Sequence, residues 1–113
     1  MFEKNLNVAF LLDFYGDVLT ERKRDALDFY YNDDMSLSEI AEEMNISRQG
    51  VRDIIKKAED ELFFLEERLH LLQKANSLRE TAERLLVGAD QSTERAVRAM
   101  LSAAGVQSEE EGA

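Results

Sequence analysis

The chain has no cysteine and no proline, and only five of its 113 residues are glycine. Without cysteine it can form neither a disulfide nor a thiolate metal site, which fits a reducing compartment. Without proline, little except helix ends interrupts the chain, and this favours an all-α fold. No apolar run approaches the roughly 20 residues of a membrane span, and no cleavable signal pattern opens the chain. We therefore expect a small cytoplasmic protein with one modest core.

The sequence offers little that supports catalysis. His70 is the single histidine, and its place on an apolar stripe predicts a packing role rather than a metal ligand. Acidic pairs such as Glu42-Glu43 and Glu66-Glu67 are adjacent, so on a helix their side chains diverge instead of converging as an acid and a base. The glycines are too scattered to form a phosphate-binding loop. We predict that the chain is not an enzyme and holds no cofactor or metal.

Residues 36–61 have the pattern of a helix-turn-helix. Ser36 can cap a short first helix, and Ser47 can cap the second. Asn45 suits the turn between them, because asparagine adopts a left-handed backbone conformation more readily than other residues with a side chain. The small side chain of Ala41 lets the two helices cross closely.

The outward face of the second helix predicts a contact with DNA. Its first turns are the part of a recognition helix that reaches base edges in the major groove. Arginine and glutamine can pair with guanine and adenine edges, and a serine beside free helix-start amides suits a phosphate. The residues predicted to bind DNA are Ser47 on phosphate, Arg48, Gln49 and Arg52 on bases, and Lys56 and Lys57 on the backbone. The alternative is a helical hairpin whose basic face is only solvated.

The sequence resembles two known groups of bacterial proteins. Residues 19–62 are similar to region 4 of bacterial sigma factors, in which a helix opened by a Leu-Thr-Glu-Arg run precedes a promoter-reading helix-turn-helix. The chain resembles over a longer stretch the YlxM family of small bacterial helix-turn-helix proteins, which are encoded beside genes of the signal recognition particle. The segments that carry this resemblance are KNLNVAFLLDFYG (4–16), LTER (19–22), YYND (30–33), SRQGV (47–51) and LEERLHL (65–71). They cover residues 1 to about 75.

The resemblance implies a DNA-binding regulatory protein, acting in protein targeting by the signal recognition particle, rather than an enzyme. The alternative is a docking regulator that binds a signal recognition particle protein without binding DNA. A sigma factor is a weak interpretation, because nothing in the sequence can serve as the separate promoter-melting region of such factors.

The charge of the chain does not choose between these alternatives. Fourteen basic against 24 acidic residues give a net charge of −10, the wrong sign for a non-specific DNA binder. Residues 47–57 form the only positive block, with four basic residues and one acidic residue. A basic patch on an acidic body permits a selective contact with double-stranded DNA, and it equally permits docking onto an acidic face of another protein.

A long apolar stripe runs along the second helix of the motif, which we expect to continue or to bend only slightly because no breaker lies between Val51 and Lys74. Its members alternate in spacings of four and three, as in a heptad seam, and are Val51, Ile55, Ala58, Leu62, Leu65, Leu69 and Leu72. Phe63, Phe64 and Leu71 widen the stripe beyond the needs of two helices. We therefore expect a homodimer that pairs two recognition helices. The alternative is that the first helix covers this surface within one chain.

The segment before the helix-turn-helix predicts two helices. The first spans residues 6–15 and ends at Gly16 as a C-cap. The second is capped by Thr20 and runs through Tyr31. The basic residues 22–24 are expected to face outward on it.

The whole chain is predicted to divide into three parts: a helical domain at 1–75 that contains the helix-turn-helix, a C-terminal helical extension at 76–106, and a disordered acidic tail at 107–113. In the extension, Ser77 and Glu80 fit a capping box that opens a helix to Leu86. A further amphipathic helix is predicted from Ser92 to Ala103. We expect the extension to be mobile or to fold on a partner.

Overall fold

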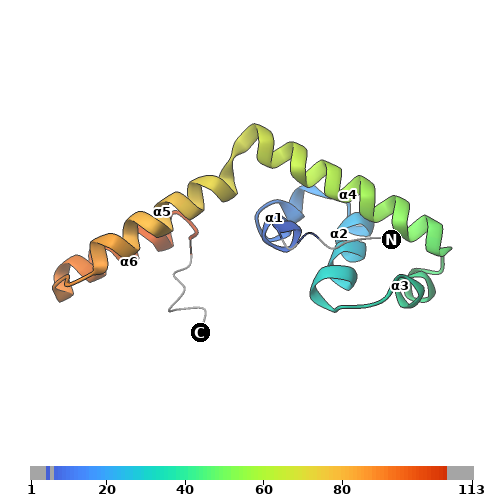
Figure 1. The fold of residues 1–113 in the computed structure, drawn as a ribbon, viewed down its shortest axis with the longest axis horizontal. Coiled ribbons are helices and arrows are strands. Elements are labelled where there is room, and N and C mark those ends of the chain that lie inside the picture. The colour runs from blue at the N-terminus through green and yellow to red at the C-terminus, as the bar shows by residue number, and fades with distance from the viewer. Residues whose placement is uncertain (1–4, 6, 107–113) are drawn as a thin grey trace. The chain divides into compact units, whose positions relative to one another are not determined.

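The computed structural model describes residues 5 and 7–106 (Figure 1), and every regular element among them is helical. This confirms the predicted all-α fold. The elements in chain order are α1 (Asn7–Tyr15), η1 (Gly16–Val18), α2 (Glu21–Leu27), η2 (Asp28–Asn32), α3 (Leu37–Met44), α4 (Arg48–Leu69), α5 (Leu71–Leu86) and α6 (Gln91–Ala103). They separate into two compact units, divided between His70 and Leu71. Residue 75, the boundary suggested by the sequence, lies inside α5. In the described part of the chain, no helix is both long and apolar enough to cross a membrane.

The first unit is built around α4. Helices α1, α2 and α3 each pack against it, as the green helix above the blue and teal ones shows (Figure 1). Four members of the apolar stripe on α4 have no exposed surface: Val51, Ile55, Ala58 and Leu62. The helices that face them contribute the buried residues Val8, Leu11, Tyr15, Ala26, Leu27, Ile40 and Ala41. This half of the stripe is therefore covered within the chain, whereas Leu69 near the helix end is 47% exposed.

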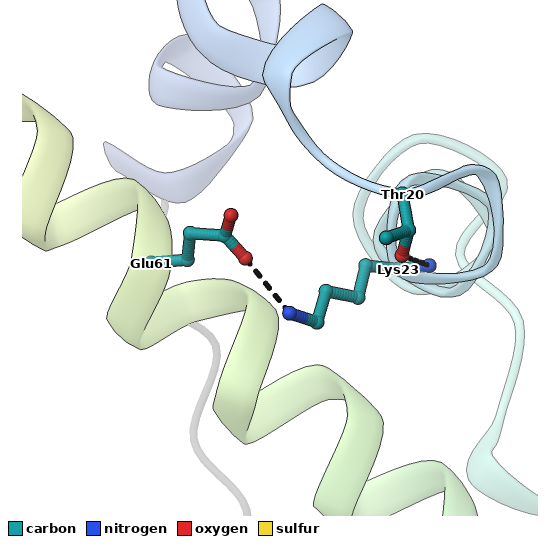
Figure 2. A network of polar contacts seen from close by, with 3 residues as sticks. All are labelled: Thr20, Lys23 and Glu61. Atoms are coloured by element: carbon teal, nitrogen blue, oxygen red, sulfur yellow. Dashed lines mark hydrogen bonds and ion pairs between the residues drawn. The ribbon is translucent and has the colours of Figure 1, made fainter.

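Three polar contacts join the earlier elements to α4. The Tyr15 hydroxyl donates to Glu66 Oε1 at 2.7 Å. The Lys23 ammonium pairs with Glu61 at 2.8 Å, and its backbone N–H donates to the Thr20 cap (Figure 2). From η2, the Tyr31 hydroxyl donates to Glu59. Because these partners lie far apart in the sequence, they fix the angle at which the N-terminal elements meet α4.

The N-terminal helices differ from the prediction in two places. The expected helix from Thr20 through Tyr31 stops at Leu27, and η2 continues it as a wider π-helical turn. Such a turn holds one more residue than an α-turn and so changes the direction of the side chains after it. Gly16 follows α1 as expected, but it opens a 3₁₀ turn instead of adopting a left-handed cap. It is buried, and a Cβ there would lie 3.4 Å from Leu12 Cδ1.

The basic segment at 22–24 is also less exposed than predicted. Arg22 faces outward, but Lys23 and Arg24 are half-buried and paired with Glu61 and Asp17. Long-range packing of α2 on α4 brings Glu61 within reach of Lys23, a neighbour that the sequence does not reveal.

The predicted continuous helix towards Lys74 is wrong, because α4 ends at Leu69. His70 adopts the left-handed conformation with φ 55°, while its N–H still donates to the Glu66 carbonyl at 2.8 Å. Its side chain is exposed, so the predicted packing role for this histidine is also wrong. A left-handed residue reverses the local twist of the backbone, and α5 begins at the next residue.

The second unit is a hairpin of α5 and α6. The two helices pack together through a small set of buried residues: Ala75, Ala82, Val97, Leu101 and Val106. The predicted capping box at Ser77 is wrong, since α5 already begins at Leu71 and holds Ser77 in its interior. The last helix is confirmed within one residue, with Asp90 Oδ1 accepting from the Thr93 N–H at 2.7 Å. The predicted tail at 107–113 lies outside the described residues.

Candidate nucleic-acid interface

The first helix of the motif begins with a complete capping box. The Glu39 N–H donates to Ser36 Oγ at 3.1 Å, and the Ser36 N–H donates to Glu39 Oε1 at 2.9 Å. Two amides that have no partner inside a helix are thereby satisfied. The hydrogen bond from the Ser36 backbone holds the pKa of Glu39 below its ordinary value. Local contacts thus define the start of α3 without help from the rest of the fold.

The turn has the left-handed residue that the sequence predicts. Asn45 has φ 57° and ψ 47°, and its N–H donates to the Ala41 and Glu42 carbonyls. The Ile46 N–H returns to the Ala41 carbonyl at 3.0 Å. This closes α3 and redirects the chain within three residues. The helix, turn and helix are therefore confirmed.

The second helix begins at the predicted cap. Ser47 Oγ accepts from the Gly50 N–H at 2.9 Å, which leaves the Arg48 and Gln49 amides without an acceptor among the described residues. A Cβ at Gly50 would lie 3.2 Å from Ser47 Oγ, closer than an ordinary contact. The absence of a side chain at Gly50 therefore leaves space for the Ser47 side chain. The open amides and the positive end of the helix dipole suit an anion such as a phosphate.

Of the six predicted DNA-binding residues, Ser47 is the N-cap of α4 and the other five lie on its first three turns. All six are exposed, and none belongs to the core: Ser47, Arg48, Gln49, Arg52, Lys56 and Lys57. We call this set the α4 basic face. Whether it binds DNA remains a prediction.

Two members of the α4 basic face already have partners on their own helix. Gln49 Nε2 donates to Asp53 Oδ1 at 3.0 Å. Lys56 pairs with Asp60 at 2.9 Å, and this hydrogen bond raises the pKa of Lys56. The sequence reasoning missed both contacts, although each joins residues four apart, the spacing at which helical side chains are neighbours.

The other three cations of the face, Arg48, Arg52 and Lys57, make no hydrogen bond or ion pair within the described residues. Elsewhere in the described chain, most basic side chains have partners: Lys23, Arg24, Arg79, Arg84 and Arg98 in polar contacts, and Arg68 over the Phe64 ring at 5.3 Å. Arg48, Arg52 and Lys57 are thus three of the six described cations that have neither a polar contact nor a ring contact, the others being Arg22, Lys74 and Arg95.

Other kinds of site find little support in the geometry. Within residues 5 and 7–106, no group of three or more His, Asp or Glu side chains has a metal-binding arrangement. Glu59, the one buried charged residue there, is bonded to Tyr31, and burial raises its pKa. It joins α4 to η2 through this contact, so we interpret it as a structural group.

Comparison with known proteins agrees with this geometry. The model of a family described as "Putative helix-turn-helix protein, YlxM / p13 like" matches residues 2–100. The chain belongs to this family. Its match extends well past residue 75, so α5 and most of α6 lie inside the family's length. The expectation that the resemblance stops near residue 75 is therefore corrected.

Individual bacterial members of the family are similar over most of this chain. The UPF0122 protein of Halalkalibacterium halodurans is 43% identical over 102 residues, which cover 89% of this chain and 94% of the relative. That of Clostridium kluyveri is 42% identical over 84 residues, covering 74% and 76%. That of Acetivibrio thermocellus reaches 53% identity over 72 residues, covering 64% and 62%.

Proposed function

We propose that this YlxM-like protein is a DNA-binding regulatory protein whose α4 basic face enters the major groove. One observation carries the proposal: Arg48, Arg52 and Lys57 lie on the exposed first turns of the second helix of a helix-turn-helix, with no counter-ion in the described chain. Arg48 and Arg52, four residues apart, are neighbours on the helix surface and repel each other in the unbound protein. A polyanion that supplies the missing counter-charges lowers that repulsion.

Each residue of the face has a defined task in this proposal. Ser47 and the open amides beside it hold a phosphate at the positive end of α4. Arg48 and Arg52 reach base edges, where arginine pairs well with guanine. Lys57 neutralises the DNA backbone, and Lys56 joins it by exchanging Asp60 for a phosphate.

The contact of Gln49 with a base depends on its hydrogen bond to Asp53. Its amide N–H₂ is engaged by Asp53 at 3.0 Å, whereas pairing with adenine uses both the amide nitrogen and the amide oxygen. The bond to Asp53 uses one of the two N–H donors of this amide and ties the side chain to its own helix, and we infer that Gln49 turns away from Asp53 when it reads adenine. We infer that Asp53 lowers the affinity for DNA in general, so that binding depends on the sites where Gln49 gains a base partner.

A homodimer is part of the proposal. Two copies present two recognition helices, so the bound sites consist of two half-sites. The site of action is the cytoplasm, where the DNA and the components of the signal recognition particle are both found.

The second candidate is docking to a protein component of the signal recognition particle without DNA. The charge of the chain favours it, because a net charge of −10 repels the DNA backbone at every point except the α4 basic face. In this case the same cations meet carboxylates of the partner. The two candidates differ in their response to naked DNA.

Selection of bound fragments from the host genome tests the first candidate. Wild type and Arg48→Ala/Arg52→Ala are compared at two salt concentrations. We expect a few enriched sites that the double variant loses, and wild-type affinity that falls steeply with salt because phosphate contacts release counter-ions. The spacing of the half-sites in the enriched fragments tests the dimer.

The matched control is Lys74→Ala/Arg95→Ala. It removes the same charge from two exposed cations of the second unit that have no partner in the described chain. This control should retain the wild-type sites. Equal losses in both double variants would mean that only net charge matters, and absence of enrichment at low salt would reject DNA reading. The same proteins, used to pull down purified signal recognition particle components, then test the second candidate.

A further inference from the structure

Helix α5 has an exposed stripe of leucines. Leu71, Leu78 and Leu85 recur every seven residues and are 40%, 45% and 57% exposed. Seven residues make about two helical turns, so successive members of the stripe drift by only about 20° around the helix. These three leucines, which we call the α5 leucine stripe, therefore lie along one ridge of the second unit, about 10.5 Å apart.

The hairpin that bears this stripe has a small core of its own. Of its five buried residues, two are alanines: Ala75 and Ala82, which lie on α5 against α6. Short helices are marginal in water unless packing of an apolar face stabilises them. A pair of helices that buries so little gains much from covering its remaining leucines.

The charges beside the stripe define what can cover it. Carboxylates of α5, at Glu80 and Glu83, lie on the far side of the helix from Leu78, about 140–160° away at about 100° per residue. The side of the stripe away from Ala75 carries Lys74, Ser77, Thr81 and Arg84. Lys74 points outward, whereas Arg84 donates to Thr81 Oγ1 at 3.3 Å. No carboxylate of α5 therefore lies on this face, and two copies can approach there without opposing carboxylates from this helix.

We propose that the α5 leucine stripe is a self-association surface whose occupant is the same stripe of a second copy of this chain. The ridge is symmetric about Leu78, with one leucine seven residues before it and one seven residues after. A two-fold axis through Leu78 therefore matches every leucine with a leucine, as an isologous contact requires. Two hairpins joined in this way complete a four-helix bundle, the common solution for helices with one apolar face.

The exposed phenylalanines of α4 are less suited to this role. Phe63 and Phe64 are adjacent, so they point about 100° apart, and Arg68 lies over the Phe64 ring. Leu69 lies about 120° around the helix from Phe63. These residues widen the surface of α4 but form no ridge that a symmetric partner can match.

Cysteine cross-linking tests the proposal directly, because the chain has no cysteine of its own. In the full chain, Leu78→Cys places one thiol at the proposed two-fold axis. We expect oxidation to give a covalent dimer at least tenfold faster than in Glu80→Cys, a matched exposed position on the other side of α5. A disulfide forms only where the two Cβ atoms approach within about 4.5 Å.

Two further variants give the direction of pairing and check the geometry. If the helices are antiparallel, Leu71→Cys cross-links with Leu85→Cys in a mixture but not with itself; if they are parallel, each cross-links with itself.

Sedimentation should show a concentration-dependent dimer for wild type and for Phe63→Ser/Phe64→Ser, and a monomer for Leu78→Glu with unchanged helix content. Equal rates for Leu78→Cys and Glu80→Cys, with a monomeric wild type, would overturn the proposal. None of these readouts involves DNA, so they stand apart from a failure of the DNA-binding function.

Discussion

Gln49 donates a hydrogen bond to Asp53 at 3.0 Å, which places a carboxylate inside the group of side chains proposed to read DNA. The contact has two effects in the unbound protein. It occupies one of the two amide N–H donors of Gln49 and ties that side chain to its own helix, and the Asp53 carboxylate adds a negative charge to the group. Under the proposed function, both effects weaken binding to any DNA and leave room for sequence preference, because only a favourable base compensates for the lost contact.

Removal of this carboxylate should strengthen DNA binding. We expect Asp53→Ala to bind DNA about fivefold more tightly, equivalent to about 1 kcal/mol, and to discriminate less between sites. The reason is that one repulsive charge is lost and Gln49 is released. Titration of a labelled selected site and of a scrambled duplex, at one fixed salt concentration, measures both quantities.

Glu83→Ala is the control for this change, since it removes one exposed carboxylate from the second unit. An equal gain in affinity for both variants would show that Asp53 acts only through net charge. In a double-mutant cycle with Gln49→Ala, additive effects would show that Asp53 does not act through Gln49.

The left-handed turn of the helix-turn-helix should tolerate glycine but not a branched residue. Asn45 has φ 57°, where a β-branched side chain is strained. We expect Asn45→Gly to keep stability within about 1 kcal/mol, and Asn45→Val to lose about 1–2 kcal/mol. Urea unfolding followed by circular dichroism measures both. Equal stability of the two variants would mean that the turn relaxes into another conformation.

The apolar stripe of α4 should be important for stability only in its first half. Leu62 has no exposed surface, so Leu62→Ala is expected to lose about 2–5 kcal/mol through lost burial and an unfilled cavity. Leu69 is 47% exposed, and Leu69→Ala should lose less than about 1 kcal/mol. Unfolding midpoints of the two variants, measured at the same protein concentration, test the difference. If Leu69→Ala lost more stability than this limit, another protein surface would have to cover the end of α4.

The buried carboxyl of Glu59 should make stability fall as pH rises. Burial raises its pKa above the ordinary value of 4.5, while the hydrogen bond from Tyr31 lowers it by a smaller effect. The folded chain therefore binds this proton more tightly than the unfolded chain does. Its stabilising effect is complete below pH 4.5 and is lost as pH rises through the folded-state pKa.

Glu59→Gln removes this pH dependence and retains an oxygen that accepts from Tyr31. We expect the variant to gain stability relative to wild type as pH rises from 4.5 to 7, because the amide never ionises. Unfolding curves at several pH values measure the difference between the two proteins, in which titration of the other groups cancels. A constant difference over this range would contradict the prediction.

Much of the interface could be predicted from sequence because its determinants are local. The capping box at Ser36, the turn at Asn45 and the N-cap at Ser47 all depend on contacts within about four residues. The hydrogen bond between Gln49 and Asp53 is equally local, and spacing alone could have revealed it. The shorter α2 could not be predicted, because residues 20–33 contain no proline or glycine to mark the π-helical turn.

The sequence by itself determined the helical class, the helix-turn-helix and the composition of the α4 basic face, since caps, turn preferences and the side-chain period of a helix are properties of short segments. Tertiary structure decided which half of the apolar stripe is buried and which carboxylates of α4 receive Tyr15, Lys23 and Tyr31. It also decided that α4 ends at a left-handed His70. These outcomes depend on how helices cross, because a crossing brings together residues that no local spacing relates.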